Sequence, residues 1–179
     1  MDQDLSAFVA DRFEAIHAAR PHTDFPRWRR IDDRTSRPFA TLGYRDAADG
    51  PLFLETYLDE RIERILSAAI GRSVAREAIV EIGCLAATPS PALLRLWRDT
   101  AEELRDSHAF AVATLTRPLR QMFARIGLPL TLLAAADPTR LADASGWGHY
   151  YELDPQVCAG PIREGAERLA GYAARMVRR

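Results

Sequence analysis

Cysteine is nearly absent from the 179-residue chain, which has only Cys84 and Cys158. Two cysteines this far apart form neither a disulfide framework nor a metal-ligand spacing. The four histidines show no metal-binding spacing either, so the sequence predicts no metal site. Free thiols fit a reducing compartment best, and we expect the cytoplasm.

Long apolar runs and an excess of one charge are missing too. No apolar stretch approaches the ~18 residues of a membrane span. The acidic start, MDQDLSAF, lacks the positive region and apolar core of a signal peptide. The formal net charge of −1 offers no basic field for nucleic acid. We therefore expect one soluble globular domain over residues 1–179.

Helical and extended patterns alternate along the chain, which predicts an α/β protein with a mixed sheet covered by helices. Apolar residues at helical spacing predict helices over 4–19, 60–70, 93–104, 117–126 and 161–179. Shorter apolar runs predict strands over 38–47, 51–58, 76–86, 108–116, 128–135 and 148–153.

Turn and cap residues mark several boundaries. Asp49-Gly50 predicts a hairpin turn between 38–47 and 51–58. The remaining predicted caps are Asp59, Ser90-Pro91 and Thr116 at helix starts and Gly71 and Gly127 at helix ends.

The segment 21–37, PHTDFPRWRRIDDRTSR, is polar and broken by proline. It is either a surface loop anchored by Trp28 or a lid over a substrate or partner, since long loops are often functional.

The stretch 76–86, REAIVEIGCLA, has the pattern of a buried strand but contains two residues that do not suit one. Glu81 puts a carboxylate among apolar residues, and a buried charge is costly unless it is paired or neutralised. Gly83 in a strand interior usually marks a bulge or a close approach to the backbone. With regular pairing, Glu81, Gly83 and Leu85 would share one face. The strand leads through AATPSP to a helix, which makes it a candidate ligand site.

Four ordered blocks resemble the thermostable hemolysin family: TLGYRDAADGPLFLETYLDERIERIL, REAIVEIGCLA, TLTRPLRQMFARIGLPLTLLAAADPTRL and WGHYYELDPQVCAG. The resemblance implies a GNAT-type, acyl-CoA N-acyltransferase-like fold related to that of the acyl-homoserine-lactone synthases. Such a fold has a mixed, mostly antiparallel sheet, flanked by helices, with a splayed central strand pair. The single domain then divides into an N-terminal helix and loop (1–37), the family core (38–160) and a C-terminal helix (161–179).

Two departures from the family pattern matter. The usual motif is close to EVGNLA, and Cys84 stands where asparagine is typical. The superfamily's glycine-rich pyrophosphate loop is replaced by Ala86-Ala-Thr-Pro-Ser-Pro-Ala92, whose backbone has less freedom to wrap a pyrophosphate. The donor is therefore either acyl-CoA or an acyl-phosphopantetheine on a carrier protein. In both cases it is a co-substrate and not a permanently bound cofactor.

The resemblance places the acyl-pantetheine arm in a gap between 79–85 and 110–116. Gly83 would let the arm approach, and N–H groups near Ala86 and at the helix start at Ser90 would face the donor's phosphate. The alternative is that Gly83 only relieves packing. The expected donor-binding residues are Ile82, Gly83, Cys84, Leu85, Ala86, Thr116, Arg117 and Arg120.

Glu81 is the first candidate for catalysis, because a buried carboxylate with a raised pKa can deprotonate an attacking amine. Its alternative role is a structural ion pair with Arg45 or Arg117. Glu55, also among apolar residues, could bind the acceptor amine or face solvent from a hairpin. The resemblance also implies a tyrosine as general acid to the departing thiolate; of Tyr150 and Tyr151, which alternation puts on opposite faces, Tyr150 is the candidate.

Two further groups have alternative roles. Arg117 and Arg120 open a helix, where the dipole disfavours cations, so they are either surface arginines or lie near an acceptor carboxylate, a phosphate or Glu81. Cys84 is not expected to be a nucleophile, because a lone cysteine in an apolar strand is usually inert packing.

The sequence thus favours transfer of an acyl group from a thioester donor to a small amine such as an amino acid. The alternatives are a membrane-active, haemolytic protein, with the basic tail 161–179 on an anionic surface, and a non-catalytic acyl-binding module. Expected partners are the thioester donor, which is either acyl-CoA or an acyl carrier protein, the amine acceptor, and a second copy of the chain at an exposed strand edge. Nucleic acid is not expected.

Overall fold

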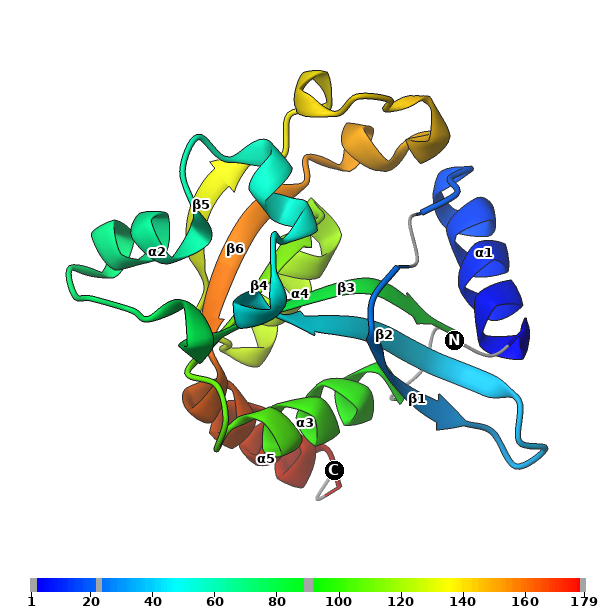
Figure 1. Ribbon diagram of the computed structural model, residues 1–179. Coiled ribbons are helices and arrows are strands. Elements are labelled where there is room, and N and C mark those ends of the chain that lie inside the picture. The colour runs from blue at the N-terminus through cyan, green and yellow to red at the C-terminus, as the bar shows by residue number, and fades with distance from the viewer. Residues whose placement is uncertain (1–2, 22–23, 89–91, 178–179) are drawn as a thin grey trace.

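A six-stranded sheet runs through the computed structural model, which describes residues 3–21, 24–88 and 92–177 (Figure 1). The strands are β1 Arg27–Asp32, β2 Pro38–Asp46, β3 Ile79–Ala87, β4 Phe110–Leu115, β5 Thr131–Ala135 and β6 Gln156–Pro161. Their order in the sheet is β1-β2-β3-β4-β6-β5. The β3–β4 ladder is parallel and the other ladders between described strands are antiparallel. The predicted mixed, mostly antiparallel sheet is confirmed.

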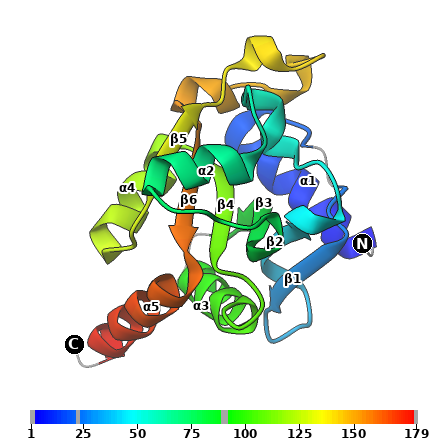
Figure 2. The ribbon, with the colours of Figure 1, turned by 60° about the vertical axis from the view of Figure 1, so that its left-hand side comes forward.

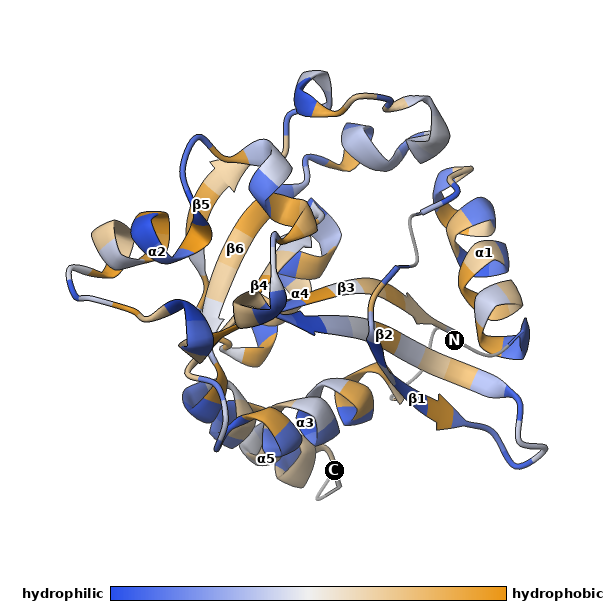
Figure 3. Ribbon diagram, viewed as in Figure 1, coloured by the Kyte–Doolittle hydropathy of each residue, from blue (hydrophilic) through white to orange (hydrophobic). Residues whose placement is uncertain are grey.

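Helices cover both faces of this sheet. They are α1 Gln3–His17, α2 Ile62–Ile70, α3 Ala92–Leu104, α4 Arg117–Ile126 and α5 Ile162–Val177. Figure 2 shows α3 and α5 side by side at one end of the view, with α2 crossing in front of the strands. In Figure 3, α3 and α5 are striped by hydrophobic and hydrophilic residues, as expected for helices that bury one side.

Alternating strand residues supply two apolar layers, one on each face. On the first face Leu42 and Ile82 pack beneath α3, α4 and α5. On the second face Ile79 packs against α2 and the segment that precedes it. Beside them, α1 packs on Trp147 and Tyr150.

Helix ends largely follow the sequence signals. Gly71 and Gly127 have φ of 71° and 85° and end α2 and α4, as predicted. The expected cap at Ser90-Pro91 lies outside the described residues. Asp59 is not a cap, because α2 begins only at Ile62; the Asp59 carboxylate instead accepts a hydrogen bond from Arg140 at 2.7 Å.

The predicted strand 51–58 is wrong. Residues Phe53–Tyr57 form a 3-10 helix. The two neighbours of β2 in the sheet are β1 and β3, so the segment 51–58 does not pair with it. The Glu55 carboxylate explains the turn, since it accepts the Leu52 N–H at 2.9 Å and the Ile62 N–H at 2.9 Å. In a strand, backbone N–H groups would donate to a neighbouring strand; here the Glu55 side chain accepts those of Leu52 and Ile62.

Two other segments also differ from expectation. The polar segment 21–37 is not all loop, since β1 forms the sheet edge within it. Its charged side chains suit an edge strand, where one side of the ladder is open to solvent. The strand expected over 148–153 is instead a 3-10 helix, Tyr150–Leu153, and β6 follows it.

Candidate active site

The central strand β3 bulges at the position marked by Gly83. Beyond the Gly43–Gly83 pair, Cys84 and Leu85 together oppose Leu42 of β2. Cys84 has φ of 48°, the left-handed conformation often found at the first residue of a bulge. The extra residue turns Leu85 to the opposite face from Gly83, so the expected regular alternation fails at this point.

The same strand separates from β4 just before the bulge. The parallel ladder consists of three pairs, Ile79–Phe110, Val80–Ala111 and Glu81–Val112. The expected splayed central pair is therefore present. A cavity of about 90 Å³ lies at the separation, with Glu81, Gly83, Thr114 and Tyr150 in its wall. We call it the Glu81 cavity.

Glu81 is held in this cavity by backbone donors. Its side chain is 3% exposed. One carboxylate oxygen accepts the Phe53 N–H at 3.0 Å, and the other accepts the Leu54 N–H at 2.9 Å. Burial raises the pKa of Glu81, although these two hydrogen bonds oppose the rise. The site therefore contains an oriented carboxylate whose affinity for a proton is increased.

The arginines considered as partners of Glu81 have other contacts. Arg117 lies 3.4 Å from an Asp154 oxygen. Arg45 is paired with Glu81 in the β2–β3 ladder, and its positive charge acts to lower the pKa of Glu81. The Arg45 guanidinium nevertheless lies 3.2 Å from the Asp24 carboxylate. Glu81 is thus bound by backbone amides, and within the described part of the chain neither Arg45 nor Arg117 forms an ion pair with it.

Glu55 lies apart from the Glu81 cavity, in a half-buried ion-pair cluster. Arg76 donates to its two oxygens at 2.7 and 3.0 Å and to Glu63 at 2.7 Å. Burial alone would raise the pKa of Glu55, but the Arg76 and backbone hydrogen bonds lower it to about 2. The structure therefore gives Glu55 a role in holding the 52–55 turn, whose N–H groups bind Glu81.

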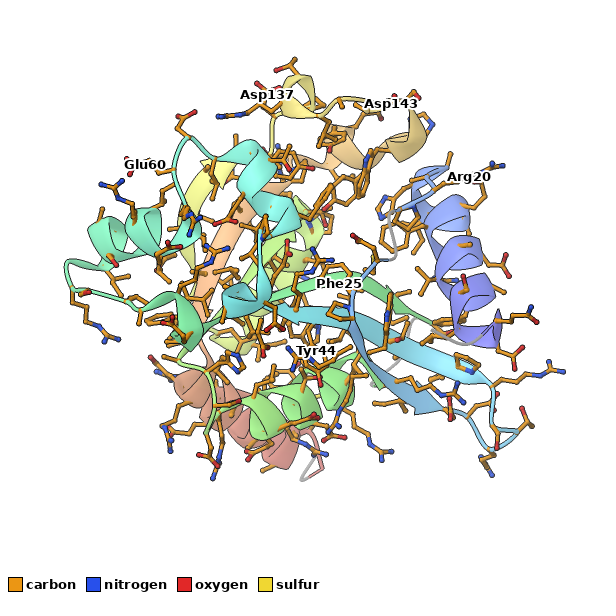
Figure 4. The ribbon with its side chains drawn as sticks, in the orientation of Figure 1. Arg20, Phe25, Tyr44, Glu60, Asp137 and Asp143 are labelled. Atoms are coloured by element: carbon orange, nitrogen blue, oxygen red, sulfur yellow. The ribbon has the colours of Figure 1, made fainter. Side chains whose placement is uncertain are left out.

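A phenylalanine side chain covers the glycine pair. A Cβ added at Gly83 would lie 2.4 Å from Phe25 Cζ, and one at Gly43 would lie 2.6 Å from Phe25 Cγ. Figure 4 shows Phe25 at the centre of the molecule, over the central strands. Trp28 Nε1 donates to the Phe25 carbonyl at 2.9 Å, which fixes the segment. The sequence signalled a close approach to Gly83 but not that Phe25 makes it.

Tyr150 also lies in the cavity wall and is 9% exposed. Its hydroxyl donates to the Thr114 carbonyl of β4 at 3.3 Å. Burial raises the pKa of Tyr150, so the hydroxyl keeps its proton at neutral pH. Tyr151 instead shares a 2.7 Å hydrogen bond with Tyr57.

The expected donor-binding residues divide into two groups. Ile82, Gly83, Cys84 and Leu85 line the Glu81 cavity. The others, which are not in its wall among the described residues, are Ala86, Thr116, Arg117 and Arg120. Arg120 donates to the Asp154 carboxylate at 2.7 Å and to the Asp154 carbonyl at 2.6 Å. The anion expected near α4 is therefore Asp154 of the same chain.

A second, apolar cavity of about 80 Å³ lies between the sheet and α3, α4 and α5. The two cavities share Ile82, Trp97, Ala113 and Leu115 in their walls, so they meet at the separation of β3 and β4. The Trp97 indole nitrogen is buried there, and the described residues offer it no hydrogen-bond partner. We call this second space the apolar cavity.

Across residues 3–21, 24–88 and 92–177, no three His, Cys, Asp or Glu side chains are grouped to hold a metal ion. None of the described helices is both long and apolar enough to cross a membrane.

The family model for thermostable hemolysin matches residues 1–166. The chain belongs to the thermostable hemolysin family. No curated protein matches the sequence at a significant level.

Solved structures share the fold of this hemolysin-family chain at low sequence identity. The acyl-homoserine-lactone (AHL) synthase LasI is 13% identical, with a TM-score of 0.62 over 94% of this chain and 86% of LasI. BjaI, a CoA-dependent acyl-homoserine lactone synthase solved with SAM and isopentyl-CoA, is 13% identical, with a TM-score of 0.59 over 93% and 80% of the two chains. FeeM, an N-acyl amino acid synthase from uncultured soil microbes, is 14% identical, with a TM-score of 0.57 over 92% of each chain. At these identities the likeness establishes the fold.

Proposed function

We propose that this hemolysin-family protein is an N-acyltransferase that moves an acyl group from a pantetheine thioester to an amine. The observation that carries the proposal is the buried Glu81 carboxylate in a cavity that lies where β3 and β4 separate. Fold-level support comes from LasI and BjaI, which are named as acyl-homoserine lactone synthases, and from FeeM, which is named as an N-acyl amino acid synthase.

The separated strands suggest where the donor would lie. Beyond Glu81, β3 and β4 no longer pair, and both strands contribute to the wall of the Glu81 cavity. An extended pantetheine arm carries amide groups that can pair with strand edges, as peptides do when they extend a sheet. The thioester would then lie beside Glu81.

The acyl tail would extend into the apolar cavity. A water-sized group needs roughly 10–15 Å³ of such space, so about 80 Å³ accommodates on the order of six methylene-sized groups. The walls are almost wholly apolar, with Leu104, Phe123 and Leu169 among them. A tail of medium length is therefore the expected substrate.

In this reaction, the amine nitrogen attacks the thioester carbonyl, a C–N bond forms and the C–S bond breaks. Glu81 takes the proton that the attacking nitrogen loses, and its raised pKa suits it to this work near neutral pH. Tyr150 is the candidate to protonate the departing thiolate, because its hydroxyl is protonated and lies in the same wall.

The test combines binding and turnover. Native mass spectrometry with CoA, octanoyl-CoA and octanoyl-carrier protein should show that the acylated donors bind better than their bare forms. Glu81→Gln should then lower amide formation about 10²- to 10⁴-fold, the range for loss of a general base. Glu77→Gln, an exposed carboxylate beside the same strand, is the matched control. Unchanged turnover in Glu81→Gln would contradict the mechanism.

The lytic alternative depends on the C-terminal helix, whose apolar side is already in use. Ile162, Ala166 and Leu169 of α5 are at most 5% exposed. A membrane could bind this side only if the helix left the core. Dye release from anionic liposomes at low protein concentration would be needed to favour lysis.

A further inference from the structure

The charges at the Glu81 cavity are of one sign. Among the described residues of its wall, the charged side chains are Asp24 and Glu81, and both are acidic. The same two carboxylates add to the effect of burial in raising the pKa of the Cys84 thiol to about 12. The described wall of the space in which an acceptor would meet the thioester therefore contains carboxylates and no cationic side chain.

The nearest cation is already engaged. The chain has 24 basic residues, and all of them are arginine. The Arg45 guanidinium donates to the Asp24 carbonyl at 2.9 Å and to the Pro51 carbonyl at 3.4 Å, and it lies 3.2 Å from the Asp24 carboxylate. A carboxylate on the acceptor would have to displace Asp24 to pair with Arg45, and an unpaired carboxylate is costly to bury.

Aromatic rings form much of the remaining wall. They come from α1 (Phe13), the 53–57 turn (Phe53 and Tyr57) and the 147–150 segment (Trp147 and Tyr150). The Phe53 and Trp147 rings are stacked with centroids 5.8 Å apart. Aromatic faces attract cations and pack against apolar or aromatic groups.

We infer that the acceptor is a primary amine with an apolar or aromatic body and no free carboxylate, in place of an amino acid. Its ammonium would be drawn to the acidic cavity and lose one proton to solvent, so that Glu81 can take the second proton during attack, while its body would lie against the rings. This inference rests on the proposed acyl transfer and names the acceptor class for that same cavity.

The experiment compares matched acceptors. With octanoyl-CoA or octanoyl-carrier protein as donor, kcat/KM for amide formation is measured for phenethylamine and tyramine against phenylalanine and tyrosine. The methyl esters of both amino acids lack the carboxylate charge but are at least as large as the free amino acids, so they distinguish an effect of charge from an effect of size. We expect the amines and the esters to exceed the free amino acids by at least about tenfold, since tenfold corresponds to a modest charge penalty.

A variant pair tests the cause. Asp24→Asn removes the carboxylate that pairs with Arg45 and should raise kcat/KM for the free amino acids. The ratio of kcat/KM for the amines to kcat/KM for the free amino acids should therefore fall. Asp49→Asn is the control, since Asp49 is an exposed carboxylate that pairs with Arg27 outside the cavity wall. It should leave the ratio unchanged.

The outcomes separate this inference from the proposed function. Free amino acids that react as fast as the amines, or faster, overturn the acceptor class while acyl transfer stands. An Asp24→Asn variant with an unchanged ratio overturns the role given to Arg45. Absence of amide with every acceptor and both donors overturns acyl transfer and the inference together.

Discussion

Replacing Gly83 by alanine should destabilise the protein because Phe25 occupies the space of the new methyl group. The added Cβ would lie 2.4 Å from Phe25 Cζ and 2.8 Å from Cε2. Carbon atoms prefer separations of about 3.5–4.0 Å, so the overlap exceeds ~1 Å. Overpacking of this kind costs about 1–3 kcal/mol in the free energy of unfolding. The ring must leave the glycine pair or the strand must shift.

A double-mutant cycle measured by urea unfolding isolates this contact. In a Phe25→Ala background, Gly83→Ala should cost nothing or stabilise by up to about 1 kcal/mol, because strand glycine is itself unfavourable. The coupling free energy between the two positions should therefore be about 1–3 kcal/mol. Gly171→Ala in α5 is the control. Among the described residues, the nearest neighbour of the new Cβ would be Arg175 Nη1 at 3.6 Å, so this change should be neutral or stabilising.

The result that refutes this reasoning is a cost for Gly83→Ala that is the same with and without the Phe25 ring. Such additivity would mean that Phe25 does not lie over the glycine pair. The Glu81 cavity would then have a different wall on that side.

Three other predictions follow from single side chains. The pKa of Glu55 is lowered from 4.5 to about 2, so this carboxylate should contribute about 3 kcal/mol to the free energy of unfolding above pH 4.5, and the contribution should disappear as the pH falls towards 2. Urea unfolding of the wild type and of Glu55→Gln across this pH range measures the contribution. Parallel pH profiles for the two proteins would contradict the prediction. Trp97→Phe keeps a ring but removes an N–H that has no partner among the described residues, so unfolding titrations should show equal or greater stability. An oxygen of the bound donor would satisfy this N–H in the wild type, so calorimetry should show weaker donor binding by the variant. The Cys84 thiol, with a pKa raised to about 12 by burial and nearby carboxylates, should resist alkylation by iodoacetamide at pH 8 in the folded protein, and rapid labelling followed by mass spectrometry would disprove this.

The sequence predicted the features that depend on local backbone chemistry. Gly83 inside an apolar run indicated the bulge, and Gly71 and Gly127 indicated the helix ends. Glu81 was identified because a carboxylate in a buried strand requires an explanation, and its two backbone donors supply one. Each of these inferences needed only the residue and its near neighbours in the chain.

The errors arose where a distant partner decides the structure. The apolar run in 51–58 fits a strand, but Arg76 binds Glu55 and so favours a turn. The charged run 27–32 looks like a loop until β2 pairs with it. Phe25 could not be assigned to the glycine pair, because Gly43 and Gly83 become neighbours only when β2 and β3 form their ladder.

The short ladder between β3 and β4 also has a consequence for how the chain assembles. Strands β1, β2 and β3 come from the N-terminal half of the chain, and β4, β5 and β6 come from the C-terminal half. Each half can complete its own antiparallel ladders with strands synthesised close together, and nearby pairing is fast. Among the described residues, three residue pairs then join the halves in the sheet. We therefore expect each half-sheet to form first and their docking to be the late step of folding.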